Sequence, residues 1–450
     1  MIRMMLGTLT VGATIAAPLL AQRRPAVRPL GAVTATARGF SIVGSVRSLS
    51  DGSVLVNDPM GRRLVLFDSL LVERVVVADS TAATANAYAQ RMGGLLAFRG
   101  DSSLFVDPQS FSMLVVDPAG KIARSMAVPR SRDAMQLAGL TGSAGFDPAG
   151  ALVYRAGFNF AFRGAPGAAP GGPPMLPQIP DSAGIIRVNL ATRQVDTVGR
   201  IKTPSIRLTT TEVNGGTMTR PMVDPLPIVD DWVMLPDGTV AFIRGLEYRV
   251  EWVTPDGTRT TGPKIPFDWQ RLSDEEKVTF MDSVKVARER LQAEMASRGG
   301  AEAAMTGMMG GGGPGGAGPI IVTRQEGVRG AAPRDGPGGG TTVTRGPGSG
   351  PGGFQMGPLE FINPRDLPDY KPPFFSGAAR ADLDGNIWIR TIPTRAIPGG
   401  PIYDVINRQG ELIERVQVPE GRTIVGFGVG VAYLMSRSEG VAILERARLK

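Results

Sequence analysis

A short phrase recurs along the chain, and polar side chains follow it at one position. Each copy has a turn centred on Asp-Gly or a near equivalent, four or five strand-forming residues, a polar break and a second apolar strand, as in residues 51–56 and 64–68. Beyond the first strand stand acids, an amide and arginines, namely Asn57, Asp58, Asp107, Arg155, Arg244, Arg390 and, as a looser equivalent, Arg437. A guanidinium group binds carboxylate or phosphate through two parallel hydrogen bonds, so these arginines suit an anionic or zwitterionic ligand.

Other roles for the same residues stay open. The charges can solvate loops or form Arg–Asp pairs between neighbouring units. Asn57, Asp58 and Asp107 offer the oxygen ligands that calcium prefers, but no Glu joins them and the arginines of the set repel a cation. Asp58 with Asp107 is the carboxylate pair that a glycosidase would need. We therefore name no catalytic residue and no metal ligand, and we expect no cofactor, with calcium as the alternative.

The composition excludes several classes of enzyme. The 450 residues include no cysteine, which removes disulfides, thiolate catalysis and cysteine-based zinc sites. They also include no histidine, so a Ser-His-Asp triad, an imidazole base and a histidine metal ligand are all excluded. The formal net charge of +8 favours acidic partners such as anionic glycans, lipid head groups or surface polymers.

The first residues have the pattern of an export signal. Arg3 precedes an apolar run at residues 6–20, and a small-residue cleavage site lies just before Gln22. Because Gly12 and Pro18 interrupt a run of only about 15 residues, it falls short of the roughly 20 that span a bilayer. The sequence therefore predicts a signal peptide at residues 1–21, a mature chain without a transmembrane span, and a periplasmic or extracellular location.

The recurrent phrase occurs in six units. Such self-similarity indicates small sheets that pack against copies of one another, and four strands per unit is typical of β-propeller blades. The sixth unit, at residues 423–446, shows only three strands, and an open sheet edge would promote aggregation. We expect residues 31–37 to supply the missing strand and so to close the last blade.

Residues 22–450 are thus predicted to form one all-β domain with two insertions. Ser273 and Glu276 have the spacing of a capping box, and Val278, Met281 and Val284 follow at roughly helical intervals, which predicts a helical insertion over residues 272–298. Residues 299–357 form a Gly/Pro-rich tract with too few apolar residues to fold, so this second insertion is predicted to be disordered.

The tryptophans are interpreted by their place in this pattern. Trp232, Trp252 and Trp388 fall within predicted strands, so we expect them to pack between blades rather than to form a sugar-binding platform. Trp269, in the loop before the predicted helix, is the exception.

The strings at residues 49–58 (LSDGSVLVND) and 381–390 (ADLDGNIWIR) resemble the blade signature of six-bladed β-propellers, the NHL-repeat and related bacterial exported group. The resemblance implies a ring of blades around a central channel, in which the second strand of each blade ends at the face where the loops gather. It places the seven polar residues at that face. Because the superfamily contains binding modules, sensors and enzymes, the resemblance does not choose among them.

Together these observations predict an exported, monomeric six-bladed β-propeller that acts as a noncatalytic binding or scaffold protein. Its partner would be an anionic small molecule, a glycan or an envelope protein, and not a nucleic acid. A scaffold would use the helix from residue 272 and a hairpin near Asn214 as its contact. The alternative is a propeller-type hydrolase or lyase that uses carboxylates with or without calcium.

Overall fold

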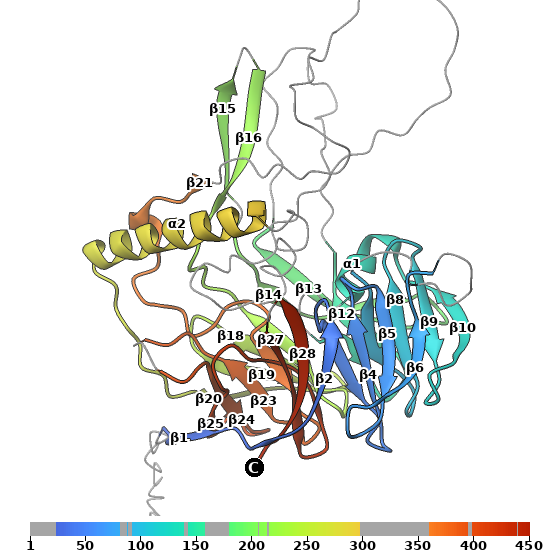
Figure 1. The fold of residues 1–450 in the computed structure, drawn as a ribbon. Helices are drawn as coiled ribbons and strands as arrows, with labels where there is room; N and C mark the ends of the chain where they lie inside the picture. The colour runs from blue at the N-terminus through green and yellow to red at the C-terminus, as the bar shows by residue number, and fades with distance from the viewer. Residues whose placement is uncertain are drawn as a thin grey trace, which may run out of the picture.

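The computed structural model describes residues 24–81, 88, 92–138, 143–157, 180–205, 207–213, 216–297, 360–394, 398–438 and 440–450. The predicted signal peptide and the predicted disordered tract at residues 299–357 lie outside these residues. Within the described part, six sheets, five of four strands and one of five, form blades around a central axis (Figure 1). The predicted six-bladed β-propeller is confirmed.

Blades one to three each use strands that follow one another along the chain. Blade one consists of β3 (Ser45–Ser48), β4 (Val54–Asp58), β5 (Arg63–Phe67) and β6 (Glu73–Ala78). Blade two consists of β7 (Gly94–Ala97), β8 (Ser103–Asp107), β9 (Ser112–Val116) and β10 (Ile122–Ala127). Blade three consists of β11 (Gly145–Phe146), β12 (Leu152–Arg155), β13 (Ser182–Val188) and β14 (Val195–Lys202).

Blades four to six complete the ring. Blade four consists of β17 (Asp231–Met234), β18 (Val240–Arg244), β19 (Arg249–Val253) and β20 (Arg259–Lys264). Blade five consists of β22 (Ala379–Ala381), β23 (Ile387–Arg390), β24 (Ile402–Ile406) and β25 (Leu412–Gln417). Blade six consists of β26 (Thr423–Gly428), β27 (Val431–Ser438), β28 (Val441–Arg448) and an N-terminal strand, β2 (Val33–Phe40).

The N-terminal strand closes the last blade, as the sequence predicts. β2 pairs antiparallel with β28 along most of its length, with Val33 opposite Ala447 and Ala37 opposite Leu444. A second strand that the sequence does not reveal, β1 (Val27–Pro29), pairs parallel with β25 and adds a fifth strand to blade five. The N-terminal segment therefore joins blades five and six.

The hydrophobic core lies between the blades. Each of the six junctions between neighbouring blades has its own cluster of buried side chains, with Val56 facing Tyr433 between blades one and six, for example, and Ile243 facing Ile387 between blades four and five. Trp232, Trp252 and Trp388 are buried in these junctions, as their strand positions predict. Because every blade packs on both sides, its second strand is apolar on both faces, and β4 and β8 are buried at every residue.

Alternating strand directions give the ring two different faces. The first strand of each blade meets the second through a short turn, and Gly52, Gly238 and Gly385 take the left-handed φ angles of 83–84° that these Asp-Gly turns require. We call this side the turn face. The second and fourth strands end at the opposite side, which we call the loop face because the longest connections leave from it, including residues 203–230 and 265–378.

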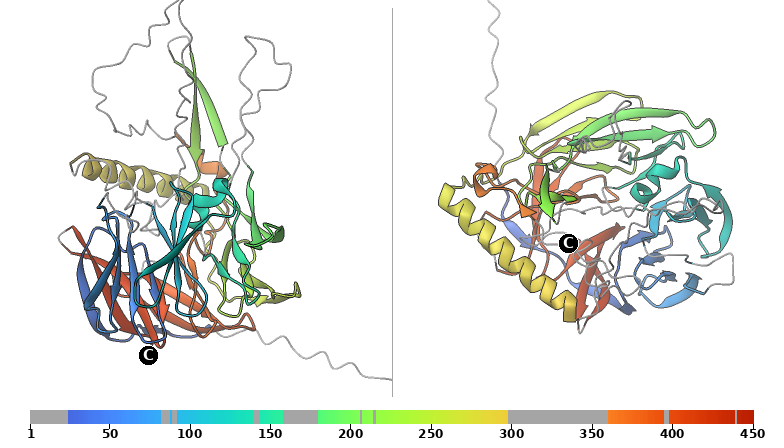
Figure 2. Two further views of the ribbon diagram at one scale, coloured as in Figure 1. Left: turned by 90° about the vertical axis from the view of Figure 1, so that its right-hand side faces the viewer. Right: turned by 90° about the horizontal axis from the view of Figure 1, so that it is seen from above.

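The insertions stand on the loop face. The antiparallel hairpin of β15 (Arg207–Val213) and β16 (Gly216–Val223) projects from the ring. The helix α2 (Asp274–Ser297) runs along one side of the ring (Figures 1 and 2). Four short elements complete the described structure, namely the 3₁₀ turns η1 (Ser131–Asp133) and η2 (Pro364–Asp366), α1 (Ala134–Leu137) and β21 (Glu360–Phe361). Within the described part, no helix is both long and apolar enough to cross a bilayer.

The predicted helix is present and begins at its predicted cap. The backbone N–H of Ser273 donates to Glu276 Oε2 (2.8 Å), and that of Glu276 donates back to Ser273 Oγ (3.2 Å). Met281 and Val284 are buried, but Val278, expected on the same face, is 48% exposed. Lys277 is buried in its place, because its aliphatic chain packs under the helix while Nζ reaches Asp369 at 2.7 Å.

We predict that ring closure governs the stability of the whole fold. A chain that begins at Ser41 lacks β1 and β2, so the edge of β28 is left without a sheet partner; its melting temperature should fall by roughly 10 °C or more, with aggregation. A chain that begins at Gly31 loses β1 alone and should melt between the two. Equal melting of all three proteins in a calorimeter would show that the N-terminal strands do not hold the ring.

Candidate functional site

The seven polar residues predicted from the sequence all lie at the loop-face end of a second strand. Asn57 and Asp58 end β4, Asp107 ends β8, and Arg155 ends β12. Arg244 ends β18, Arg390 ends β23, and Arg437 is the last residue but one of β27. Their contacts decide which of them face a ligand and which hold the fold.

The acidic and amide members hold the connections of their own blades. Asp58 is buried and accepts hydrogen bonds from the backbone N–H groups of Ser41 (2.8 Å), Ile42 (3.1 Å) and Gly61 (2.8 Å). Asn57 donates to the carbonyl of Gly93 (2.7 Å) and accepts from the hydroxyl of Tyr88 (2.8 Å). Both side chains thus tie the ends of blade one to the connections on either side of it.

Tyr88 lies close to all three of Asn57, Asp58 and Asp107. Burial raises its pKa well above the usual range, and the nearby carboxylates of Asp58 and Asp107 raise it further. Asp107 in turn accepts from the hydroxyl of Ser110 (2.6 Å) and the backbone of Gln109 (3.1 Å), which closes the turn after β8. The oxygens that a cation would need are therefore occupied by donors of the chain itself.

The arginines are spread over separate junctions. Arg244 donates to Glu251 (2.6 Å), Asp230 (2.8 Å) and the carbonyl of Arg200 (2.9 Å), so its guanidinium group is saturated. Arg437 donates to the carbonyl of Ser41 (3.3 Å), whose N–H is held by Asp58, and so links blades six and one. Arg390 is half-buried at the end of blade five.

Arg155 is the most deeply placed of the arginines. Its side chain is buried, and loss of hydration lowers its pKa, while Asp231 at the start of blade four partly offsets this. Asp231 is itself buried and accepts hydrogen bonds from the backbone of Trp232 (2.9 Å) and of Ala379 in blade five (2.9 Å). Burial raises the pKa of Asp231 to about 6. In the described part of the chain, no three acidic side chains form a group that could hold a metal ion.

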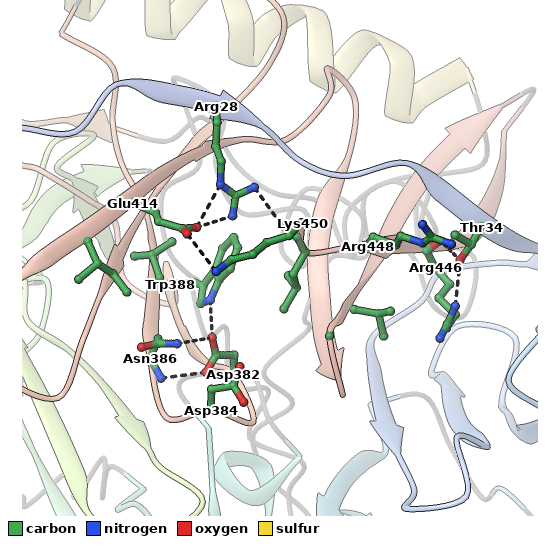
Figure 3. Close-up of a pocket in the computed structure, with 15 residues that line it drawn as sticks. Arg28, Thr34, Asp382, Asp384, Asn386, Trp388, Glu414, Arg446, Arg448 and Lys450 are labelled. Atoms are coloured by element: carbon green, nitrogen blue, oxygen red, sulfur yellow. Dashed lines mark hydrogen bonds and ion pairs between the residues drawn. The ribbon is translucent and has the colours of Figure 1, made fainter.

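A cleft between blades five and six opens on the turn face (Figure 3). Its volume of about 550 Å³ is in the range of clefts that hold small molecules. The segment around β1 crosses its outer side, the Asp-Gly turn of blade five forms one wall, and the end of β28 forms the other. We call it the closure cleft, because it lies under the segment that closes the ring.

One wall of the closure cleft is cationic. Arg446 and Arg448 are alternate residues of β28, so their side chains leave the strand on the same side. Arg446 Nη1 donates to Thr34 Oγ1 (3.0 Å), whereas Arg448 is exposed and its side chain has no hydrogen bond or ion pair to any other described residue. Within the described part of the chain, no acidic side chain forms an ion pair with the guanidinium group of Arg448.

The opposite wall holds three acids, Asp382, Asp384 and Glu414, of which Asp382 and Glu414 are already engaged. Glu414 lies between Arg28, whose Nε donates to it at 3.1 Å, and Lys450, whose Nζ is 3.6 Å away. Asp382 is buried and accepts from Trp388 Nε1 (2.9 Å) and from Asn386 (2.8 and 3.0 Å). The wall therefore presents an ion-pair network, a satisfied carboxylate and the exposed carboxylate of Asp384, with the indole of Trp388 at its side (Figure 3).

Sequence reasoning missed the closure cleft because its basic residues come from opposite ends of the chain. The signal that existed was the alternation of Arg446 and Arg448, which places two basic side chains on one side of a strand, with Lys450 two residues further on. Nothing in the sequence showed that Arg28 would lie near them.

Comparison with known proteins yields likeness of structure alone. No protein-family profile matches the chain, and no curated protein matches it in sequence. Among solved structures it is similar to a gluconolactonase from Xanthomonas campestris, at 9% identity and a TM-score of 0.36 over 96% of this chain and 99% of the other. It is similar to the calcium-binding regucalcin of Agrobacterium tumefaciens, at 11% identity and a TM-score of 0.35 over 95% and 97%.

A third similar structure is virginiamycin B lyase from Staphylococcus aureus, at 12% identity and a TM-score of 0.24 over 49% of this chain. The match spans about half (55%) of that lyase's own length. This chain is a six-bladed β-propeller. Each of these is a likeness of fold alone.

We predict that Asp58 stabilises the fold, independently of any ligand. Asp58→Ala leaves three N–H groups, one buried and two partly buried, without their acceptor, so the free energy of unfolding should fall by about 3 kcal/mol. Asp384→Ala, at an exposed position of the turn in blade five, should change it little. Urea unfolding followed by circular dichroism measures both, and equal stability of the two variants would remove the structural role of Asp58.

We predict a pH dependence from Asp231. Because its pKa is raised in the folded state, the native protein holds this proton more tightly than the unfolded chain does. The contribution to stability is full below about pH 4 and is lost as the pH rises through 6, by at most about 3 kcal/mol. Asp231→Asn should flatten this part of the profile in urea titrations from pH 4 to 8, whereas the exposed Asp196→Asn should not. An unchanged slope in Asp231→Asn would contradict the assignment.

Proposed function

We propose that the mature chain is an exported, noncatalytic binding propeller, and that a small anionic ligand occupies the closure cleft. The observation that carries the proposal is the cationic wall, in which Arg448 has no partner among the described residues. An unpaired guanidinium group beside a second arginine presents several N–H donors in a fixed geometry, which suits a carboxylate or phosphate. The periplasmic or extracellular location and the monomeric state belong to the same proposal.

The charge balance of the closure cleft supports an anion. Four basic and three acidic side chains line it, an excess of one positive charge, and Glu414 is shared by two of the basic residues, Arg28 and Lys450. Asp384 is exposed on the turn, at the wall opposite Arg448. The carboxylate of Asp382 already accepts hydrogen bonds from Asn386 and Trp388. A ligand carboxylate or phosphate would therefore relieve repulsion between cations, and it would not have to displace a partner from Arg448.

The contacts on the loop face favour binding over catalysis. A general acid or base needs a titratable group that can reach a substrate, but Asp58 and Asp107 are bonded to backbone and side-chain donors that fix turns. Arg244 is likewise held by two acids. Arg155, Arg390 and Arg437 have partners as well, so the contacts do not decide whether an anion is met at the loop face, and that stays a prediction.

The test compares the two places directly. Isothermal titration of the mature protein with inorganic phosphate, citrate and a hexose phosphate, with and without calcium, should show binding of at least one anion. Arg446→Ala with Arg448→Ala should weaken that binding by about tenfold or more, because each charge-assisted hydrogen bond contributes about 1.5–3 kcal/mol. Arg124→Ala, an exposed arginine on the outer strand of blade two, lowers the net charge without touching the cleft and should leave binding unchanged.

Each other outcome has a defined meaning. Loss of binding in an Arg155→Ala, Arg390→Ala double variant but not in the cleft variant would place the ligand on the loop face. Calcium-dependent turnover of a lactone or glycoside would make the protein an enzyme. Unchanged affinity in both double variants, or no binding of any anion, would overturn the proposal.

A further inference from the structure

Trp269 differs from every other tryptophan of the chain. All four lie in described residues; Trp232, Trp252 and Trp388 are at most 5% exposed, while Trp269 is 41% exposed. A large aromatic side chain left in water forgoes the burial that it would gain in a core, so its exposure needs a reason. Its position in the long connection between blades four and five separates it from the closure cleft.

A second exposed aromatic side chain lies beside it. The connection folds back on itself as a narrow antiparallel ribbon, in which the N–H of Leu272 donates to the carbonyl of Asp369 (2.7 Å) and the N–H of Lys371 to that of Gln270 (3.0 Å). Arg271 and Tyr370 are thereby paired across the ribbon. In such a pair the two side chains leave the same face, and Trp269, two residues before Arg271, leaves it too. Tyr370 is 47% exposed.

The ribbon is anchored to the rest of the protein. The ring of Trp269 packs edge to face against Phe267 at 5.3 Å, and Phe267 packs in the same way against the buried Tyr248 at 5.5 Å. Arg24 lies over Phe267 (5.9 Å) and forms an ion pair with Asp268. On the other strand, Asp369 is held by the buried Lys277. The two exposed rings are therefore presented by a supported backbone, so binding would cost little ordering entropy.

The charge around the two rings is positive. The acids of the ribbon, Asp268 and Asp369, are each paired with a basic residue. Neither Arg271 nor Lys371 forms a side-chain hydrogen bond or ion pair with another described residue, although the charge of Arg271 helps to lower the pKa of Asp369. Arg271 is exposed, directly across the ribbon from Tyr370 and two residues along it from Trp269. Two exposed rings with an exposed guanidinium group on the same face of the ribbon combine an apolar surface with a donor for oxyanions.

We propose that Trp269, Arg271 and Tyr370 form a platform for an acidic polysaccharide. The C–H face of a pyranose ring stacks on an aromatic ring, and the carboxylate or sulfate of a charged sugar accepts hydrogen bonds from Arg271. A single-stranded nucleic acid could meet the same chemistry, but the predicted export of the chain and its net charge of +8 favour an anionic glycan outside the cytoplasm. This site is independent of the closure cleft.

Ligand binding at this platform can be followed by the fluorescence of Trp269, because its indole is exposed. Because acrylamide reaches only exposed indoles, quenching of the intrinsic fluorescence reports Trp269 against the three buried residues. Titration with alginate or heparin should protect this fraction and shift its emission, whereas neutral dextran should do so weakly. Trp269→Phe should abolish the quenchable fraction, and Arg271→Ala should weaken the binding of charged glycans by roughly tenfold and that of dextran little.

Binding is measured separately by affinity electrophoresis in gels that contain each glycan. Trp269→Ala and Tyr370→Ala should lose retardation, while Phe111→Ala, which removes an aromatic side chain of similar exposure in blade two, should keep it. Circular dichroism melting confirms that each variant is folded. The proposal is overturned if no glycan protects Trp269, if Trp269→Ala and Tyr370→Ala bind like the native protein, or if oligothymidine alone gives the protection.

Discussion

Each blade of this protein has two apolar faces, and only a closed ring covers both faces of all six. The six junctions each contain a cluster of buried side chains, so removal of one blade contact would expose two apolar surfaces at once. No disulfide can hold the ring, because the chain contains no cysteine. Closure therefore depends on the pairing of β2 with β28. This pairing joins the outer edge strand of blade six, β2, to a strand that lies some 400 residues later in the sequence.

Hydrogen bonds at the junctions between blades make this packing directional. Tyr88, Tyr154 and Tyr248 are buried, and each hydroxyl donates to a buried amide or carboxylate, at Asn57 (2.8 Å), Asp133 (2.9 Å) and Asp404 (2.8 Å). Burial raises the pKa of Asp404 as it does that of Asp231, since the ionised form loses its hydration. Such bonds fix the angle between neighbouring blades, because an apolar contact can slide while a hydrogen bond cannot.

The two proposed binding places follow from how the ring is closed and interrupted. The closure cleft exists because β1 adds to the edge of blade five before the chain crosses to blade six, leaving space beneath the crossing. The aromatic ribbon exists because the connection between blades four and five is far longer than a blade needs, and part of it pairs with itself. Neither place disturbs the packing between blades, so both can vary while the scaffold stays the same.

The sequence by itself determined the repeat, the strands, the closing strand at residues 31–37 and the capped helix. These rest on local patterns: an Asp-Gly turn needs a glycine with positive φ, a buried strand needs apolar residues, and the Ser273–Glu276 cap is complete within one helical turn. Burial of the three strand tryptophans and exposure of Trp269 follow from the same patterns.

Only the tertiary structure decided the use of the polar side chains. Asp58 and Arg244 look alike in sequence as charges after a strand, yet one accepts three backbone N–H groups and the other is held between two acids. Arg28 meets Glu414, and Arg271 meets Tyr370, across long stretches of chain. A local sequence pattern reflects the conformation that neighbouring residues require. Whether a charged side chain is paired depends instead on which partner the folded chain brings within about 4 Å.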